Sequence, residues 1–175
     1  TVHPPDVRAF IGLDTISGCQ PWRFEPRSFS TPGASLAWEI LAPDGAITAS
    51  GNEPNPSFEL TQVGVHRVLL SAARCGEDTD TVFVNVLPAP EVSFLADPAV
   101  CLGDQLVLSN TSSGIAGGFY TLGNGNTLNQ INGVVTYPDS GDYTLLFTGY
   151  STLNNCPATI SQPVNVRSLP AVTIA

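Results

Sequence analysis

The sequence contains no lysine and no methionine, and only 12% of its 175 residues are charged. Its six arginines are outnumbered by 15 acidic residues, which gives a formal net charge of −9. Nucleic acids and anionic membranes both attract basic side chains. We therefore predict that the chain neither binds nucleic acid nor inserts into membranes, and the missing lysine also excludes a Lys–Asn isopeptide cross-link.

Long apolar runs are missing as well. No stretch approaches the ~20 residues of a membrane-spanning helix, and no signal peptide is recognisable, so we expect a piece from the middle of a longer chain. The two histidines are His3, in an apparent linker, and His66, in a predicted strand. No Gly-x-Ser-x-Gly turn and no phosphate-binding loop is present, so we predict no catalytic residues and no enzyme activity.

The abundant residues indicate β-structure. The chain has 16 Gly and 15 Pro, is rich in Thr, Val and Ser, and shows no sustained helical periodicity. β-branched side chains suit the half-buried surface of a sheet. With 42% hydrophobic residues the chain can bury a core. We therefore predict an all-β fold.

An internal repeat divides the chain. The triplet Val-Asn-Val at residues 84–86 recurs 80 residues later at residues 164–166, and a proline-rich joint follows each copy. This spacing predicts a first repeat over residues 1–87, a second over 88–168, and the truncated start of a third over 169–175. Neighbouring repeats of the same chain or fibre are the expected partners.

Two long strands show the clearest alternation of apolar and polar residues, one over residues 64–72 and one over 141–148. A period of two assigns to the core His66, Val68, Leu70 and Ala72 in the first and Tyr143, Leu145 and Phe147 in the second. Further strands are predicted at residues 22–24, 36–40, 57–60, 79–86, 105–108, 119–122, 134–137 and 163–166. About seven short strands in each repeat predict two tandem immunoglobulin-like β-sandwiches.

The four cysteines follow the same repeat. Cys101 lies 82 residues after Cys19, and Cys156 lies 81 residues after Cys75. Of the three possible pairings, the repeat favours Cys19–Cys75 and Cys101–Cys156, one disulfide in each domain. Disulfides persist in oxidising compartments, so this pairing predicts a secreted or cell-surface protein. Four free cysteines in a cytosolic protein are the alternative.

Short motifs occur in the same order in both repeats. The second has Tyr-Thr-Leu-Gly-Asn-Gly at residues 120–125 and Gly-Asp-Tyr at 141–143, and the first has Trp-Glu-Ile at 38–40, Asp-Gly at 44–45 and Asn-Pro at 55–56. In these motifs the chain resembles tandem PKD-type repeats of secreted and cell-surface proteins of the Bacteroidetes kind. The resemblance implies PKD-like sandwiches in a spacer, adhesin or filament segment.

The densest acidic run suggests a cation site. Glu77, Asp78 and Asp80, together with Asp104, are candidate calcium ligands, because hard cations favour several oxygens at close range. A solvated turn is the alternative interpretation. No other cofactor is expected.

A few exposed positions are candidates for binding or modification. Tyr150, on the longer predicted hairpin, is the candidate for stacking against a sugar ring of a surface polysaccharide. Asn110 begins an Asn-Thr-Ser glycosylation pattern. Thr15 and Thr81 follow the Asp-Thr-apolar pattern that Bacteroidetes use for O-glycosylation.

Two functions follow from these observations. The first is a non-catalytic structural or adhesive module, part of a long array that forms a stalk or filament at the bacterial cell surface. The second is a carbohydrate-binding accessory module of a secreted hydrolase. A covalent array and a polymer made by strand exchange are both compatible with the first.

Overall fold

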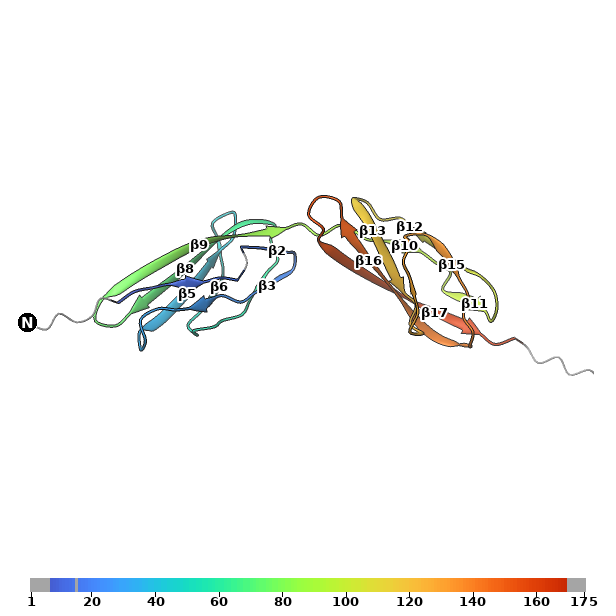
Figure 1. Cartoon of the computed structure of the whole chain (residues 1–175), viewed down its shortest axis with the longest axis horizontal. Helices are drawn as coiled ribbons and strands as arrows, with labels where there is room; N and C mark the ends of the chain where they lie inside the picture. The colour runs from blue at the N-terminus through green and yellow to red at the C-terminus, as the bar shows by residue number, and fades with distance from the viewer. Residues whose placement is uncertain (1–6, 15, 170–175) are drawn as a thin grey trace, which may run out of the picture. The chain divides into compact units, whose positions relative to one another are not determined.

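The computed structural model describes residues 7–14 and 16–169, and Figure 1 shows the course of the chain. The chain divides into two compact units, residues 1–88 and 89–175, and each has its own hydrophobic core. All regular structure in the described residues is β-strand, so none of them forms a helix long and apolar enough to cross a membrane.

Unit 1 is built around one five-stranded sheet with the order β2-β9-β8-β5-β6. Two short pairs, β1-β4 and β3-β7, complete it. Among its described residues the strands are β1 (Ile11–Gly12), β2 (Ser17–Cys19), β3 (Trp22–Phe24), β4 (Arg27–Ser28), β5 (Ser35–Leu41), β6 (Ile47–Gly51), β7 (Phe58–Leu60), β8 (Gly64–Ala73) and β9 (Glu77–Leu87). All pairings are antiparallel except that of β2 with β9.

Unit 2 repeats this plan. A five-stranded sheet has the order β11-β17-β16-β13-β14, and a three-stranded sheet has the order β10-β12-β15. Its described strands are β10 (Phe94–Leu95), β11 (Ala99–Cys101), β12 (Leu106–Asn110), β13 (Ile115–Thr121), β14 (Thr127–Leu128), β15 (Gly133–Val135), β16 (Gly141–Ser151) and β17 (Pro157–Arg167). Again only the short strand β11 pairs in parallel, with the final strand β17.

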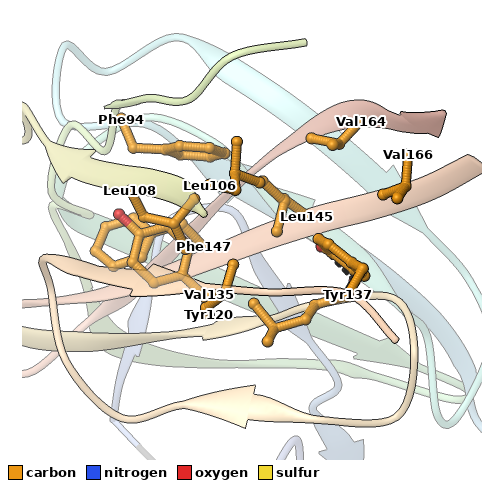
Figure 2. Packing of buried hydrophobic residues seen from close by; sticks show 11 residues of the cluster. Phe94, Leu106, Leu108, Tyr120, Val135, Tyr137, Leu145, Phe147, Val164 and Val166 are labelled. Atoms are coloured by element: carbon orange, nitrogen blue, oxygen red, sulfur yellow. Dashed lines mark hydrogen bonds between the residues drawn. The ribbon is translucent and has the colours of Figure 1, made fainter. Parts of the chain in front are cut away.

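Each core lies between the five-stranded sheet and the smaller strands, as in a β-sandwich. In unit 2, Figure 2 shows side chains from both sheets meeting in one layer. Tyr120 and Phe147 come from the larger sheet, with ring centroids 4.6 Å apart, and Phe94 packs edge-on against Tyr120 from the smaller one. The Tyr120 hydroxyl donates to the Ile131 carbonyl at 3.1 Å, which satisfies the one polar atom of this buried side chain.

Unit 1 has a tryptophan where unit 2 has Tyr120. Trp38 is 1% exposed, and its indole N–H donates to the Glu53 carbonyl at 2.8 Å. Phe58 and Leu60 of β7 close the core from the opposite side. His66 is also buried, with Nδ1 3.2 Å from the Gly64 carbonyl. The imidazole therefore fills a core position with one ring nitrogen in a polar contact.

The alternation predicted for the two long strands is confirmed with two exceptions. The residues assigned to the core in β8, and Leu145 and Phe147 in β16, are all buried. Tyr143 is only partly buried, because it lies near the start of β16, where its ring stacks on Tyr137 at 4.3 Å. Thr148 lies on the other side of the alternation, which the period of two turns toward solvent, but it is buried. The parallel strands β2 and β11 were not predicted, because three residues are too few to show an alternation.

Candidate functional site

The N-terminal part of unit 1, which we call its leading segment, runs alongside the final strand β9. Two carboxylates of β9 hold it there. The backbone N–H of Ala9 donates to Asp78 Oδ2, and that of Ile11 donates to Asp80 Oδ2, both at 2.8 Å. Ile11 is 5% exposed and belongs to the core. The carboxylates thus satisfy backbone donors that the two-residue strand β1 leaves without a partner on that side.

Farther along β9 the leading segment is held by backbone hydrogen bonds. The Asn85 N–H donates to the Ile16 carbonyl at 2.9 Å, and the Gln20 N–H donates to the Leu87 carbonyl at 2.9 Å. Between these bonds, β2 and β9 pair in parallel. The leading segment and the final strand therefore run in the same direction, and Cys19 lies opposite Leu87 at the end of both.

Unit 2 has the same arrangement. Its leading strand β11 pairs in parallel with the final strand β17. The Asn165 N–H donates to the Pro98 carbonyl at 2.9 Å, and the Leu102 N–H donates to the Arg167 carbonyl at 2.8 Å. These bonds match the two in unit 1 position for position. The feature shared by both repeats is therefore a parallel contact between a short leading strand, the second strand of the unit, and its final strand.

The acidic candidates lie in different environments. Asp78 and Asp80 accept backbone N–H groups, whereas Glu77 is exposed at the start of β9. Asp104 belongs to unit 2, where it is exposed in the turn after β11. Within the described part of the chain, no group of three or more His, Cys, Asp or Glu side chains could hold a metal ion. Calcium binding stays a prediction.

The predicted pairing of cysteines within each repeat is wrong. Cys75 and Cys101 are free and exposed, whereas Cys19 and Cys156 are disulfide-bonded. In unit 1 the reason is the length of β9. Cys19 lies opposite Leu87, the last residue of that strand, while Cys75 precedes its first residue, Glu77. At about 3.3 Å per residue the two ends are roughly 33 Å apart, whereas the Cα atoms of a disulfide lie within about 7 Å.

The same geometry separates the cysteines of unit 2. Cys101 lies opposite Arg167, the last residue of β17, and Cys156 directly precedes Pro157, the first. The repeat in the sequence correctly matches Cys19 with Cys101 and Cys75 with Cys156. The repeat does not show at which end of the final strand each cysteine lies. Because the two cysteines of a unit lie at opposite ends, they cannot pair within it.

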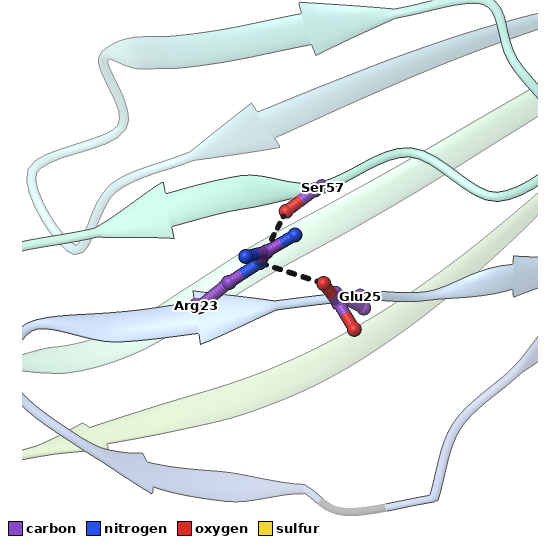
Figure 3. Close-up of polar contacts among 3 residues, drawn as sticks. All are labelled: Arg23, Glu25 and Ser57. Carbon is purple, nitrogen blue, oxygen red and sulfur yellow. Dashed lines mark hydrogen bonds and ion pairs between the residues drawn. The ribbon is translucent and has the colours of Figure 1, made fainter.

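Unit 1 also has a polar surface around Arg23 of β3. Arg23 Nε lies 2.7 Å from Glu25 Oε1 and 3.1 Å from Ser57 Oγ, as Figure 3 shows. The side chains of Arg23 and Glu25 are 78% and 58% exposed, so water screens their ion pair and it contributes at most about 1 kcal/mol to stability. Glu25 and Ser57 hold the guanidinium in place through its Nε atom. Most of its other N–H donors remain open to solvent.

Three shallow cavities of about 390, 360 and 130 Å³ adjoin this side chain, and Arg23 lines all of them. The largest is completed by Pro21, Phe58 and Glu59, and the smallest is bordered by Trp22. Hydrogen-bonding groups beside exposed apolar edges are typical of a surface that binds a polar ligand. The alternation in residues 22–25 places Arg23 and Glu25 outward, so the sequence contained this signal.

The remaining candidates are dispersed. Tyr150 lies in β16 and is only half-buried, opposite Gly117. Thr81 is exposed on β9, and Thr15 lies outside the described residues. Asn110 ends β12, where its backbone N–H donates to the Asn132 side-chain oxygen at 2.7 Å.

Burial perturbs two tyrosines of unit 2. Burial raises the pKa of Tyr120 above its usual range. The pKa of Tyr137 is raised mainly by burial and also by the neighbouring Tyr143. The Tyr137 hydroxyl donates to the Leu122 carbonyl at 2.9 Å. Both phenols belong to the core, so these pKa values describe packing rather than a reactive centre.

No protein-family model and no curated protein matches the chain. Among solved structures, fibronectin(III)-like modules of Clostridium thermocellum CbhA are 11% identical over 95% of this chain and 100% of theirs, with a TM-score of 0.39. The insect immune protein hemolin is 8% identical over 97% of this chain and 48% of its own, with a TM-score of 0.43. Bacteroides ovatus SGBP-B, solved with a mixed-linkage heptasaccharide, is 16% identical over 87% of this chain and 43% of its own, with a TM-score of 0.35.

The chain thus spans all of the first protein and less than half of the other two. Its own topology identifies the architecture, because in each unit two groups of strands enclose one core and all but the leading strand pair antiparallel. Each unit is an immunoglobulin-like β-sandwich.

Proposed function

We infer that this chain is a non-catalytic structural module of an extracellular array of PKD-like repeats, in which each sandwich transmits tension along a stalk or filament. The observation that supports this function most is the parallel contact of the leading segment with the final strand in both units. The excess of acidic residues keeps such an array soluble at the cell surface.

The mechanical argument follows from the strand directions. Tension that enters unit 1 through the leading segment and leaves after Leu87 pulls β2 and β9 in opposite directions along their length. The hydrogen bonds between two such parallel strands lie across the direction of pulling, so they share the load and break together. An antiparallel pair pulled apart from one end would instead lose its bonds one at a time.

Side chains extend this contact in both units. In unit 1 the Asp78 and Asp80 carboxylates hold Ala9 and Ile11 upstream of β2. In unit 2 the Gln162 amide does the same by donating to a leading-segment carbonyl at 2.8 Å. The clamped length is therefore longer than the three-residue strands themselves.

Force spectroscopy of the whole chain, tethered at its two ends under reducing conditions so that no disulfide carries the load, tests this function. We expect two unfolding events and a lower unfolding force for unit 1 in the Asp78→Ala/Asp80→Ala variant. Glu77→Ala is the matched control, because it removes a neighbouring carboxylate that is exposed and accepts no backbone N–H. Unit 2 of the same molecules is an internal reference.

An equal unfolding force in the double variant and the control would contradict the mechanical argument. So would unfolding of both wild-type units at the low forces of domains that lack a terminal parallel pair. Either result would leave the fold intact and remove the reason to assign a tension-bearing role.

The Arg23 surface favours polysaccharide binding as a second candidate function. Its open guanidinium donors, the Glu25 and Glu59 carboxylates and the Trp22 edge suit a neutral sugar chain, which offers hydroxyl donors and acceptors and apolar ring faces. Calorimetric titration with soluble neutral glucans and mannans tests it. Binding that is lost in Arg23→Ala and kept in Arg67→Ala, an equally charged exposed control on β8, would support this function; no binding to wild type would remove it.

A further inference from the structure

The four cysteines occupy two structurally equivalent kinds of position. Cys19 and Cys101 end the leading strands β2 and β11, and we refer to them as the edge cysteines. Both lie opposite the last residue of the final strand of their unit. Cys75 and Cys156 lie in the turn before that final strand and are referred to as the hairpin cysteines. Every unit thus has one edge and one hairpin cysteine, at opposite ends of its final strand.

Of the four cysteines, two are disulfide-bonded and two are free, and each pair contains one cysteine of each kind. One edge cysteine, Cys19, and one hairpin cysteine, Cys156, are disulfide-bonded. One of each kind, Cys101 and Cys75, is free and exposed. Since about 33 Å of strand separates the two kinds within a unit, a disulfide here cannot join an edge cysteine to the hairpin cysteine of its own unit. The bonded state of Cys19 and Cys156 is independent proof that both kinds of position take part in disulfides.

The two free thiols are open to a partner. Cys75 lies in a tight turn closed by the Arg74 N–H and the Gly76 carbonyl at 2.9 Å, and the space next to Gly76 is empty. Cys101 begins a turn in which the Asp104 N–H donates to the Cys101 carbonyl at 3.0 Å. Both are therefore presented by ordered backbone at a strand end rather than by a long loop.

We propose that Cys101 of one copy of this chain forms a disulfide with Cys75 of a second copy, so that molecules join head to tail through an edge and a hairpin cysteine. In a longer array, the next repeat of the same chain supplies the second thiol. The partner is thus another unit of the same array. The inference rests on the proposed function, because this disulfide needs an oxidising location outside the cell.

The chemistry is thiol–disulfide exchange with a low-molecular-weight disulfide as the oxidant. The Cys101 thiolate attacks one sulfur of the small disulfide, whose S–S bond breaks to release one small thiolate. The Cys75 thiolate of the second copy then attacks the Cys101 sulfur of this mixed disulfide and releases the other small thiolate. Two protein thiols are oxidised, the small disulfide is reduced, and the two protons are taken up by the released thiolates.

The test incubates the purified chain, without prior reduction, with oxidised glutathione at several protein concentrations. Products are separated on a non-reducing gel, and their linkages are identified by peptide mass spectrometry. We expect a ladder of linked multimers that contains the peptide pair Cys75–Cys101. Cys75→Ser and Cys101→Ser should each remain monomeric, and an equimolar mixture of the two variants should give a dimer and nothing larger.

A control thiol tests whether the position matters. Ala46→Cys in the Cys75→Ser background restores one exposed thiol, in the turn between β5 and β6 instead of the turn between β8 and β9. We expect it not to restore the ladder. Restoration would overturn the proposal, as would symmetric Cys75–Cys75 or Cys101–Cys101 dimers, a Cys75–Cys101 bond within one monomer, or only glutathione-capped monomers. The unfolding forces of the two units are measured under reducing conditions, where none of these disulfides persists, so failure of this inference is distinguishable from failure of the proposed function.

Discussion

Asp80 gives the sharpest prediction about how the sandwich is held together. Its Oδ2 accepts the backbone N–H of Ile11, and its Oδ1 accepts that of Thr81, both at 2.8 Å. In Asp80→Ala the Ile11 donor is left at a position that is 5% exposed. A hydrogen bond to a charged group contributes about 1.5–3 kcal/mol, and a buried donor without a partner costs about 1–3 kcal/mol. We therefore expect unit 1 to lose about 2–3 kcal/mol of unfolding free energy.

Tryptophan fluorescence isolates this effect, because Trp22 and Trp38 are the two tryptophans of the chain and both lie in unit 1. At a urea m-value of about 1.5 kcal/mol/M, the loss corresponds to a shift of the midpoint by roughly 1.3–2 M. Asp80→Asn keeps an oxygen acceptor without the charge and should lose about half as much. The tyrosine signal should not shift, since all four tyrosines lie in unit 2.

Glu77→Ala is the control that decides between a hydrogen-bonding role and a general charge effect. It removes the same charge three residues away without removing a backbone contact, so we expect a change below about 0.5 kcal/mol. Equal shifts in Glu77→Ala and Asp80→Ala would show that the loss comes from the removed charge and not from the hydrogen bond to Ile11. A calcium-dependent midpoint in wild type that disappears in Asp80→Ala would show that the carboxylate acts through a cation instead.

Three further predictions concern the cores. Because burial raises the pKa of Tyr120 and Tyr137 in the folded state, their contribution to stability is complete below pH about 10 and is lost as the pH rises through the folded pKa; urea titrations at rising alkaline pH should show unit 2 losing stability, less steeply in Tyr137→Phe, and an unchanged slope would contradict this. Trp38→Phe leaves the Glu53 carbonyl without its donor and should cost about 1–3 kcal/mol by circular dichroism; a neutral result would mean that water replaces the indole. Leu145→Ala should cost unit 2 about 2–5 kcal/mol without moving the tryptophan transition of unit 1, whereas a shift of both would show that the units unfold together.

The class of fold could be predicted because it depends on local patterns. Alternation over ten residues of β8 fixes which side chains are buried, since a strand has only two faces. The strands predicted at residues 36–40 and 119–122 are confirmed by β5 and β13, which bring Trp38 and Tyr120 into the two cores.

The parallel pairing of the leading strand with the final strand could not be predicted in this way. β2 and β11 have three residues each, and their parallel partners are separated from them by most of the unit. Asp78 and Asp80 illustrate the same limit. A run of acidic residues suggested a cation, whereas the structure brings the N–H groups of Ala9 and Ile11 to the same carboxylates.

The cysteines separate most clearly what each level determines. The nearly constant offset in the sequence identifies Cys101 as the counterpart of Cys19 and Cys156 as the counterpart of Cys75. The folded chain is needed to see that the cysteines of one repeat cannot meet, because the strand between them is rigid and roughly 33 Å long. A repeat in the sequence shows which positions are equivalent, whereas the distances between these positions depend on the folded structure.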